Sequence, residues 1–359
     1  MLSSYRSDIM ILPTSVQFAA PNRTGDKRYM NVMPNQQRRL QLKFLAALGA
    51  VGLARSAFAT GQYPDKLIRM VSPFGAGGVT DSVARLVAQQ LQKEVGQTVV
   101  VDNVAGGSGI IGTHTIARAK PDGYSLLFST NVHVINPALR SSLPFDPVKD
   151  FSPIVKVASA PLMLVVNAAS PYKTVADYVA AARSKPGELA YGSSGVGTSP
   201  HLAAEQFGQV TKTSYVHVPY NVSSAVTQAV VAGQIVSSWS GVHAAMPFVK
   251  AGKVRALGVA SDHRSHFAPD VPTFAELGIH GVNIDTWFGL FGPANLPADI
   301  EGKLSSLILK ALELPAFKES LVKLGAEAAP AGPAEFRKIV GTELASYAQL
   351  VKARGIKVE

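Results

Sequence analysis

The 359-residue sequence contains no cysteine, and this absence excludes several kinds of chemistry at once. Without thiols the chain can form neither disulfide bonds nor thiolate metal sites, and it cannot use a cysteine nucleophile. We therefore expect its stability to come from packing. The composition agrees, because 47% hydrophobic residues against 16% charged residues favours a well-packed globular protein.

The sequence also lacks any uninterrupted apolar run of about 18 residues, the length of a candidate membrane-spanning helix. Its apolar run near the N-terminus, FLAALGAVGLA at residues 44–54, is too short to span a bilayer. This run follows Arg38, Arg39 and Lys43 and is followed by small residues that end at Ala59, which is the pattern of a secretory signal peptide. We predict that residues 1–59 form a leader that is cleaved after Ala59.

Within this leader, Met33 lies close before the arginine pair, so residues 1–32 are interpreted as an over-long start ahead of the signal peptide. The arginine pair also permits twin-arginine export, but Gln41 stands where that signal has an apolar residue, which favours the general secretory route. Residues 1–59 hold eight basic and two acidic residues, so the net charge of +10 falls to +4 for the remainder. The exported protein therefore lacks the strong basicity of a nucleic-acid-binding protein.

After the leader, strand-like and helix-like patterns alternate along the chain. Residues 68–91, IRMVSPFGAGGVTDSVARLVAQQL, read as a buried strand, a glycine loop and a helix that Thr80 or Asp81 caps. Further strands are predicted at residues 98–101, 124–130, 189–192, 215–218, 235–239, 254–260 and 287–291, with helices between most of them. This alternation predicts an α/β protein whose ligands bind at the carboxyl ends of the strands.

The pattern indicates two lobes, each with a central sheet flanked by helices. A second α/β series begins at Thr174, and the residues after 291 are expected to be entirely helical and to pack back on the first lobe. We predict that residues 60–163 and 288–359 form lobe 1 and residues 164–287 form lobe 2. Two crossing strands, near residues 162–166 and 287–291, would then connect the lobes.

Two loops, at residues 74–81 and 192–201, are the candidate ligand-binding elements. Each follows a predicted strand and opens a helix, so each presents backbone N–H groups and the positive end of a helix dipole. Facing each other across a cleft, they could hold a carboxylate without an arginine. Glycine and serine in such loops are also compatible with simple connections.

Other motifs favour binding over catalysis. Gly107–Gly112 matches G-x-G-x-x-G, but four residues separate it from the preceding strand and no acidic residue closes a strand about twenty positions later. The GSSG segment at residues 192–195 fails the hydrolase pattern because Val196 replaces its last glycine. Asp262, His263 and His266 are better explained by a solvated turn than by a metal site. We expect no enzymatic activity, no cofactor and no metal.

Several long segments together resemble the Bug-type solute-binding proteins, the periplasmic receptors of tripartite tricarboxylate transporters. They are PFGAGGVTD, AGGSGIIGTHTIARAKPDGYSLLFST, NPALRSSLPFDPVKDFSPI, YGSSGVGTSPHLAAEQF, HVPY, KVRALGVASDHRS with PDVPTFAELG, and WFGLFGPANLP. The resemblance covers residues 62–359 in order. It implies a two-lobe periplasmic binding protein fold of the Venus-flytrap type, hinge closure on the ligand, and a small carboxylate or related metabolite as the ligand.

The resemblance also implies the positions of the ligand contacts. They are Phe74, Gly77, Gly78, Thr80, Asp81, Asn131 and His133 in the first lobe, and Ser193, Ser194, Gly195, Thr198, His201, Tyr220 and Ser240 in the second. The chain departs from the family pattern at Val222, Gln228 and Ser240. Acidic groups are lost on that wall, so we expect a non-amino organic acid or a neutral polar compound rather than an amino acid.

These observations predict a monomeric, exported receptor that captures a small organic acid in the periplasm for a tripartite tricarboxylate-type permease. The expected partners are this small molecule and the membrane permease subunits, without nucleic acid. Two alternatives stay open. The protein could be a ligand-sensing partner of a membrane signalling receptor, or a dinucleotide-dependent enzyme that uses Gly107–Gly112.

Overall fold

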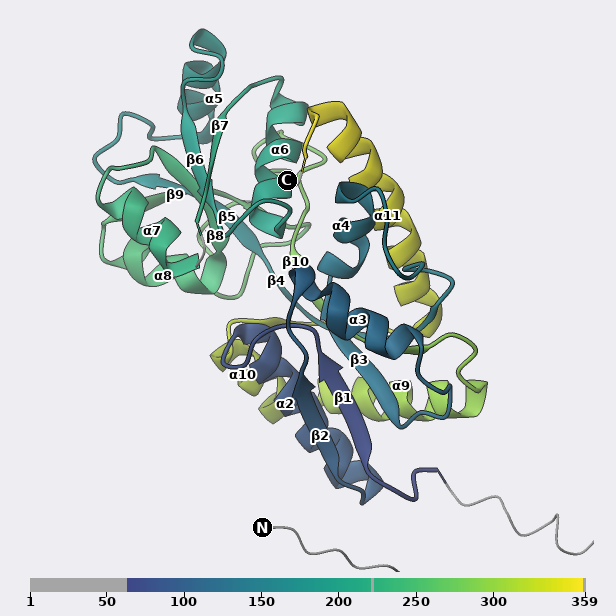
Figure 1. Ribbon diagram of the computed structural model, residues 1–359. Coiled ribbons are helices and arrows are strands. Elements are labelled where there is room, and N and C mark those ends of the chain that lie inside the picture. The colour runs from purple at the N-terminus through teal and green to yellow at the C-terminus, as the bar shows by residue number, and fades with distance from the viewer. Residues whose placement is uncertain (1–62, 221–222, 358–359) are drawn as a thin grey trace, which may run out of the picture. The chain divides into compact units, whose positions relative to one another are not determined.

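The computed structural model describes residues 63–220 and 223–357. The predicted leader with its cleavage site after Ala59, and the departure at Val222, lie outside the described residues. The described residues belong to one compact unit, Gln62–Glu359, which is built on two β-sheets (Figure 1).

The first sheet has six strands: β1 (Ile68–Ser72), β2 (Val99–Asn103), β3 (Ser125–Thr130), β4 (Phe151–Ala160), β10 (Thr286–Pro293) and β11 (Glu327–Ala331). Their order across the sheet is β11-β4-β10-β3-β1-β2. β1 pairs in parallel with both β2 and β3, whereas β10 runs antiparallel to β3 and β4. Because these three strands are parallel, the carboxyl ends of β1, β2 and β3 lie at the same edge of the sheet.

The second sheet has five strands: β5 (Leu162–Asn167), β6 (Ala190–Ser193), β7 (Val216–Pro219), β8 (Ser237–Gly241) and β9 (Val254–Ala260). Their order is β7-β6-β8-β5-β9, with β6 parallel to β7 and β8, and β5 antiparallel to β8 and β9. We refer to each sheet with its covering helices as a lobe. The two lobes thus share one plan, a parallel group of three strands extended by antiparallel strands.

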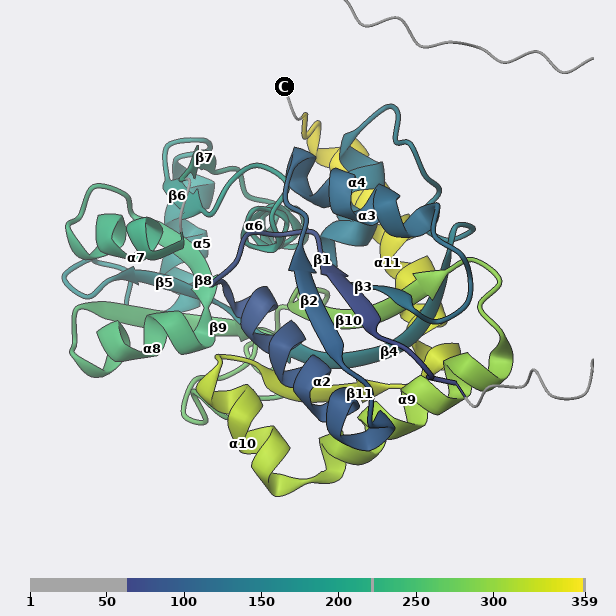
Figure 2. The ribbon, with the colours of Figure 1, turned by 60° about the horizontal axis from the view of Figure 1, so that its bottom comes forward.

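Alternate side chains of the first sheet pack against helices on opposite faces, as the period of two in a strand requires. Met70 belongs to the core under α2 (Val79–Val95), α9 (Ala298–Glu313) and α10 (Pro315–Lys323), the face that Figure 2 shows. The neighbouring Val71 belongs to the core under α3 (Ile110–Ala117), α4 (Val132–Leu139) and α11 (Pro333–Arg354).

The second sheet is covered in the same way. Leu164 packs in the core with α5 (Val175–Ser184) and α6 (Ser199–Thr211), whereas Met163 packs under α7 (Ser223–Val231) and α8 (Val242–Lys250). The cluster that holds Val71 also holds Leu164, so one apolar core runs through both lobes. Burial on this scale is the main stabilising contribution in a cysteine-free chain.

The structure confirms the predicted strands and corrects the C-terminal prediction. The residues after 291 are not entirely helical, because β11 adds an edge strand to β4. The long strand β4 was also not predicted. The chain passes from the first sheet to the second at Pro161 and returns through residues 261–285.

Helix α11 reaches from one lobe to the other. Its Phe336 packs against Trp287 of β10, with ring centroids 5.2 Å apart. Figure 1 shows that the C-terminal end of α11 lies near α6, where the Arg354 guanidinium forms an ion pair with Glu205 of α6 at 2.6 Å. This helix therefore ties the second lobe to the core of the first.

Candidate functional site

The first glycine loop, residues 73–78, connects β1 to α2. Gly77 has φ +84°, and a Cβ atom built at Gly75, Gly77 or Gly78 would meet nothing within 4 Å. The outer side of the loop is thus open to a ligand. Helix α2 begins at Val79 with Gly78 as its N-cap and no side-chain cap, so the prediction that Thr80 or Asp81 caps it is wrong. Its first N–H groups are left without a side-chain cap.

The carboxylate of Asp81 holds this loop in shape. It accepts hydrogen bonds from the Gly77 N–H at 3.0 Å and from Asn103 Nδ2 at 3.0 Å, and it pairs with the Arg85 guanidinium. Asn103 Nδ2 also donates to the Phe74 carbonyl at 3.1 Å. Burial raises the pKa of Asp81, but the hydrogen bonds from Gly77, Arg85 and Asn103 outweigh burial and hold that pKa below its usual range. Asp81 is therefore engaged within the loop.

The second glycine loop, residues 194–198, connects β6 to α6. Gly195 and Gly197 have φ +128° and +77°, conformations that favour glycine. The Ser193 hydroxyl accepts from the Gly195 N–H at 3.2 Å, and the Thr198 hydroxyl donates to the Gly195 carbonyl at 2.8 Å. Thr198 is the N-cap of α6, but its side chain makes no capping hydrogen bond to the helix. The start of α6, like that of α2, lacks a side-chain cap.

Two stacked histidines, His201 and His217, hold the second loop through hydrogen bonds to Gly197 and Ser193. The rings of His201 and His217 are 3.9 Å apart and almost parallel. His201 Nδ1 accepts a hydrogen bond from the Gly197 N–H at 3.0 Å, and His217 Nε2 lies 2.6 Å from the Ser193 hydroxyl. Burial lowers the pKa of both histidines to about 4. Both rings are therefore neutral at pH 7, and His201 acts on the loop as a positioning residue.

The two loops meet at one cavity of about 220 Å³. If water occupies about 30 Å³ each, this volume corresponds to about seven waters, which suits a small solute. Its walls come from both lobes. The lining residues are Phe74, Ser108, Val132, Asn136, Leu139, Arg140, Val196, Gly197 and Thr198.

Two of the predicted ligand contacts, Phe74 and Thr198, line this cavity. Gly77, Gly78 and Thr80 lie on the first loop or at the start of α2, and Ser194 and Gly195 lie on the second loop. Ser193 and Asp81 are buried behind these loops, where their side chains hold backbone groups. The structure therefore brings the two predicted loops together and separates residues that line the cavity from residues that support it.

Asn131 lies where β3 ends, and it connects the two lobes. Its Nδ2 donates to the carbonyl of Asp285 at 2.7 Å, and its Oδ1 accepts from the Ser199 hydroxyl of α6 at 3.0 Å. The side chain is fully buried. Asn131 thus contacts the returning chain segment and the start of α6 at once.

The structure places His133 inside an aromatic cluster. Its ring lies 4.7 Å from those of Phe151 and Phe291, and its Nε2 donates to the Pro147 carbonyl at 2.8 Å. Burial lowers the pKa of His133 to about 4. Its neighbours are core residues of the first lobe, so the side chain packs there and does not line the cavity.

Tyr220 and Ser240 also lie outside the cavity lining. The Tyr220 N–H donates to the Ser193 carbonyl at 2.9 Å, which extends the pairing of β7 and β6. Ser240 is buried in β8, where its hydroxyl lies 3.1 Å from that of Ser238 and 3.4 Å from that of Thr227. Ser240, one of the departures from the family pattern, therefore belongs to a small cluster of hydroxyls with Ser238 and Thr227.

Sequence reasoning missed the polar residues contributed by the turn before α3 and by the end of α4. Ser108 has φ +57° in a short turn of the G-x-G-x-x-G segment, and Asn136 Nδ2 donates to its carbonyl at 2.9 Å. Arg140 follows α4, and its Nη2 lies 3.4 Å from the Ser108 hydroxyl. The G-x-G-x-x-G segment that contains Ser108 was the available signal, whereas nothing local marks Asn136 or Arg140.

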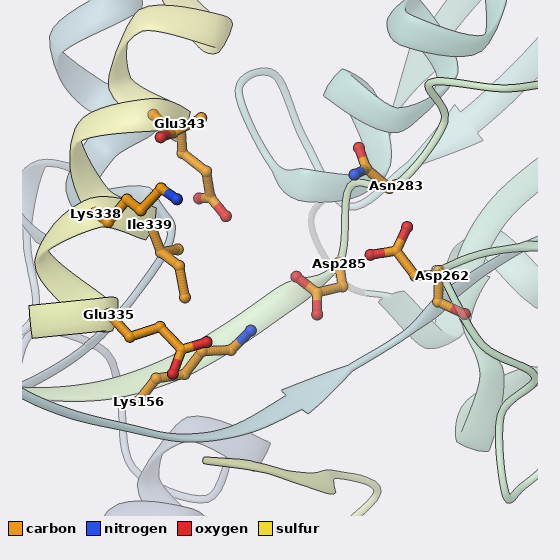
Figure 3. Close-up of a pocket in the computed structure, with 10 residues that line it drawn as sticks. Lys156, Asp262, Asn283, Asp285, Glu335, Lys338, Ile339 and Glu343 are labelled. Atoms are coloured by element: carbon orange, nitrogen blue, oxygen red, sulfur yellow. The ribbon is translucent and has the colours of Figure 1, made fainter. Parts of the chain in front are cut away.

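A second cavity, of about 460 Å³, lies where the chain returns from β9 to β10 (Figure 3). Lys156 points into it from β4, Asp285 from the position just before β10, and Glu343 approaches from α11. Glu343 accepts a hydrogen bond from the Trp287 indole at 2.7 Å, and burial raises the pKa of Glu343 to about 7. Burial also raises the pKa of Asp285. Across residues 63–220 and 223–357, no cluster of three or more His, Asp or Glu side chains could hold a metal ion.

No helix within residues 63–220 and 223–357 has both the length and the apolar character needed to cross a membrane.

Comparison with known proteins gives consistent matches. A model of the tripartite tricarboxylate transporter family receptor, TctC, matches residues 83–356. Protein BugT of Bordetella pertussis is 32% identical over 323 residues, which cover 88% of this chain and 99% of BugT. The structure of R. palustris Rpa4515 with adipate is 31% identical, with a TM-score of 0.71, and covers 82% of this chain and 99% of its own. The structure of MatC from Rhodopseudomonas palustris with bound malate is 29% identical in sequence and has a TM-score of 0.67. The match covers 80% of this chain and 100% of the MatC chain.

Proposed function

Because the chain belongs to the tripartite tricarboxylate transporter receptor family, we propose that it captures a small organic acid in the cavity between its two glycine loops. The family and the solved relatives confirm the two-lobe periplasmic binding protein fold and the role of a solute-binding receptor. The ligand and the residues that hold it are our proposal. Adipate and malate, the ligands of two relatives, make a carboxylate the first choice.

This proposal rests on the two helix starts that follow the glycine loops: Thr198 at the start of α6 lines the cavity, and α2 begins after the loop whose Phe74 lines it. Neither α2 nor α6 has a side-chain cap, so backbone N–H groups in their first turns are available to an anion, except at Pro200 of α6, which has none. The helix dipoles favour negative charge at the same ends. A carboxylate between the loops would thus be bound by backbone N–H groups and by the hydroxyls of Thr80 and Ser194, and by that of Thr198 once it turns from the Gly195 carbonyl.

We assign direct contacts to Phe74, Gly77, Gly78 and Gly195 as well as to these three hydroxyl residues. Asp81, Ser193 and His201 shape the two loops, and Asn131 joins the lobes beside them. His133, Tyr220 and Ser240 contribute through packing and hydrogen bonds behind the site.

Ligand binding would increase the fraction of molecules in the closed conformation. A solute that contacts both loops favours the conformation in which residues 60–163 and 288–359 lie against residues 164–287. The closed form would then be recognised by the permease subunits of a tripartite tricarboxylate transporter. We further propose that the receptor acts as a monomer after export and removal of residues 1–59.

A binding experiment with Thr198→Val and Thr80→Val tests the proposal. Each substitution keeps the side-chain shape but removes a hydroxyl at the site, so we expect the affinity for an organic acid to fall about 10-fold. The measurement is the rise in thermal unfolding midpoint with dicarboxylates, aromatic acids, amides, amino acids and NAD, because a ligand that binds the native state stabilises it by mass action.

Thr115→Val on the exposed side of α3 is the matched control and should leave the affinity unchanged. A rise with NAD alone would contradict the receptor assignment and support a dinucleotide enzyme. Equal affinities for the control and for both site variants would contradict the placement of the ligand between the loops.

A further inference from the structure

Arg140 introduces a positive charge into the cavity between the loops. Its backbone is fixed at the end of α4, where its N–H donates to the Asn136 carbonyl at 3.1 Å. Its Nε atom is buried and has no hydrogen-bond partner, and its Nη2 makes only a long contact, 3.4 Å, with the Ser108 hydroxyl. A buried guanidinium N–H without an acceptor is costly, so this atom is suited to receive an acceptor from a ligand.

No carboxylate of the described residues forms an ion pair with Arg140, although Asp146 lines the neighbouring surface hollow that Arg140 also borders. Within residues 63–220 and 223–357, none of the residues that line the cavity is acidic. The Ser108 hydroxyl beside it can donate a further hydrogen bond. Asn136 holds Ser108 in its left-handed conformation through the Ser108 carbonyl. Guanidinium and hydroxyl together form a donor pair that is held in place before a ligand arrives.

Much of the remaining cavity wall is apolar. Val132, Leu139 and Val196 line the cavity together with the ring of Phe74. These surfaces match a molecule with two anionic groups joined by a short aliphatic spacer. One anionic group would bind at the loops, the spacer would contact the apolar walls, and the second anionic group would bind Arg140. A monoacid of the same length would leave the guanidinium without an acceptor.

We infer that Arg140 is the residue that selects for a second carboxylate, and that the receptor prefers small aliphatic dicarboxylates over their monoanionic analogues. This inference rests on the proposed capture of an organic acid at the same cavity. It adds the residue that recognises the far end of the ligand. Planar guanidinium binds carboxylate through two parallel hydrogen bonds, which gives selectivity for geometry as well as for charge.

The test compares dicarboxylates with their monomethyl esters by isothermal titration calorimetry at pH 7. Succinate, glutarate and adipate form three such pairs, each of which differs in one charge at nearly constant length. For the best-bound pair we expect the diacid to bind the unmodified protein about 10- to 100-fold more tightly than its ester. In Arg140→Gln this ratio should fall to within about 3-fold, because the diacid loses affinity and the ester does not.

Two further variants separate this role from general effects. Arg118→Gln removes an exposed positive charge from the same lobe and should keep the ratio. Arg140→Lys keeps the charge without the planar fork and should give an intermediate ratio. Thermal unfolding of each unliganded variant verifies that the fold is intact.

The outcomes are distinct. Equal affinities for diacid and ester in the unmodified protein, or equal losses for both in Arg140→Gln, would overturn the role of Arg140 and leave the receptor function standing. Absence of binding by every diacid and every ester would overturn the proposed capture of a carboxylate, and this inference with it.

Discussion

At the scale of single residues, Glu343 links stability to pH. Its pKa is raised to about 7 first by burial and also by Asp285, so the folded protein holds this proton more tightly than the unfolded chain does. Between its ordinary pKa of 4.5 and about 7, the folded state therefore binds more protons than the unfolded state, and stability falls as the pH rises. The favourable contribution is fully present below 4.5 and is lost by about pH 7.

Glu343→Gln should remove this dependence. The amide oxygen can still accept the Trp287 indole hydrogen bond, but it carries no charge at high pH. We expect the variant to be more stable than the unmodified protein at pH 8 by about 1–2 kcal/mol, and to differ little at pH 5. Denaturant unfolding at both pH values measures this difference.

The control for this prediction is Glu335→Gln, on the same helix and at the same cavity but exposed. It should change stability by less than about 0.5 kcal/mol at either pH. A similar stabilisation by both variants at pH 8 would point to the net charge of the region instead of the burial of Glu343.

The sequence predicted the loop residues of the candidate site but not Arg140. The loop residues were predictable because glycines, a preceding strand and a following helix are contiguous in the chain. Arg140 was not, because its role depends on Ser108, 32 positions away, and on a cavity wall from the other lobe. His133 was expected at the ligand, but its aromatic neighbours come from β4 and β10, which no local pattern connects to it.

At the scale of elements, the second glycine loop depends on close contact with α4. Gly197 has φ +77°, and a Cβ atom there would overlap the Leu139 side chain. Gly197→Ala therefore combines backbone strain with a steric clash across the cavity. We expect it to lower stability by about 1–3 kcal/mol and to weaken binding of an organic acid at least about 10-fold. Calorimetric titration and denaturant unfolding of the same sample measure both effects.

Gly187→Ala is the matched control. Gly187 has φ +74° in the turn before β6, but a Cβ atom there would meet nothing within 4 Å. It should cost about 1 kcal/mol of stability and leave ligand affinity unchanged. If both variants weaken binding equally, the effect of Gly197 is one of general stability and not of loop geometry.

The elements that sequence reasoning missed are those that depend most on their neighbours. β11, with the sequence EAAPA, has little intrinsic strand preference and contains Pro330, yet it pairs with β4 at the edge of the sheet. β4 contains Pro153 and directly follows a turn-rich segment. In both cases tertiary pairing decides the structure, whereas β1, β3 and β9 carried apolar runs that predicted them.

At the scale of the whole molecule, the ion pair between Arg354 and Glu205 connects the two lobes through α11 and α6. Both side chains are mostly buried, and Glu205 also accepts a hydrogen bond from Tyr191 at 2.9 Å. Removal of one partner leaves the other charge partly buried. We expect Arg354→Gln and Glu205→Gln each to lower stability by about 2–3 kcal/mol, with a coupling energy above about 1 kcal/mol in a double-mutant cycle.

Arg337→Gln, which removes a half-exposed partner of Glu301, gives the comparison within the same helix. Its cost should be below about 0.5 kcal/mol. Additive losses for Arg354→Gln and Glu205→Gln would show that the two side chains act separately and that α11 is held to the second lobe by packing alone.

The stacked pair of His201 and His217 has a consequence for the conditions under which the receptor can operate. Histidine ordinarily changes charge close to neutral pH, but these two rings stay neutral down to about pH 4. The proposed export would expose the protein directly to the acidity of its surroundings. Because the two histidines that support the second loop do not titrate in mildly acidic medium, the fold keeps the shape of this loop constant as the pH varies.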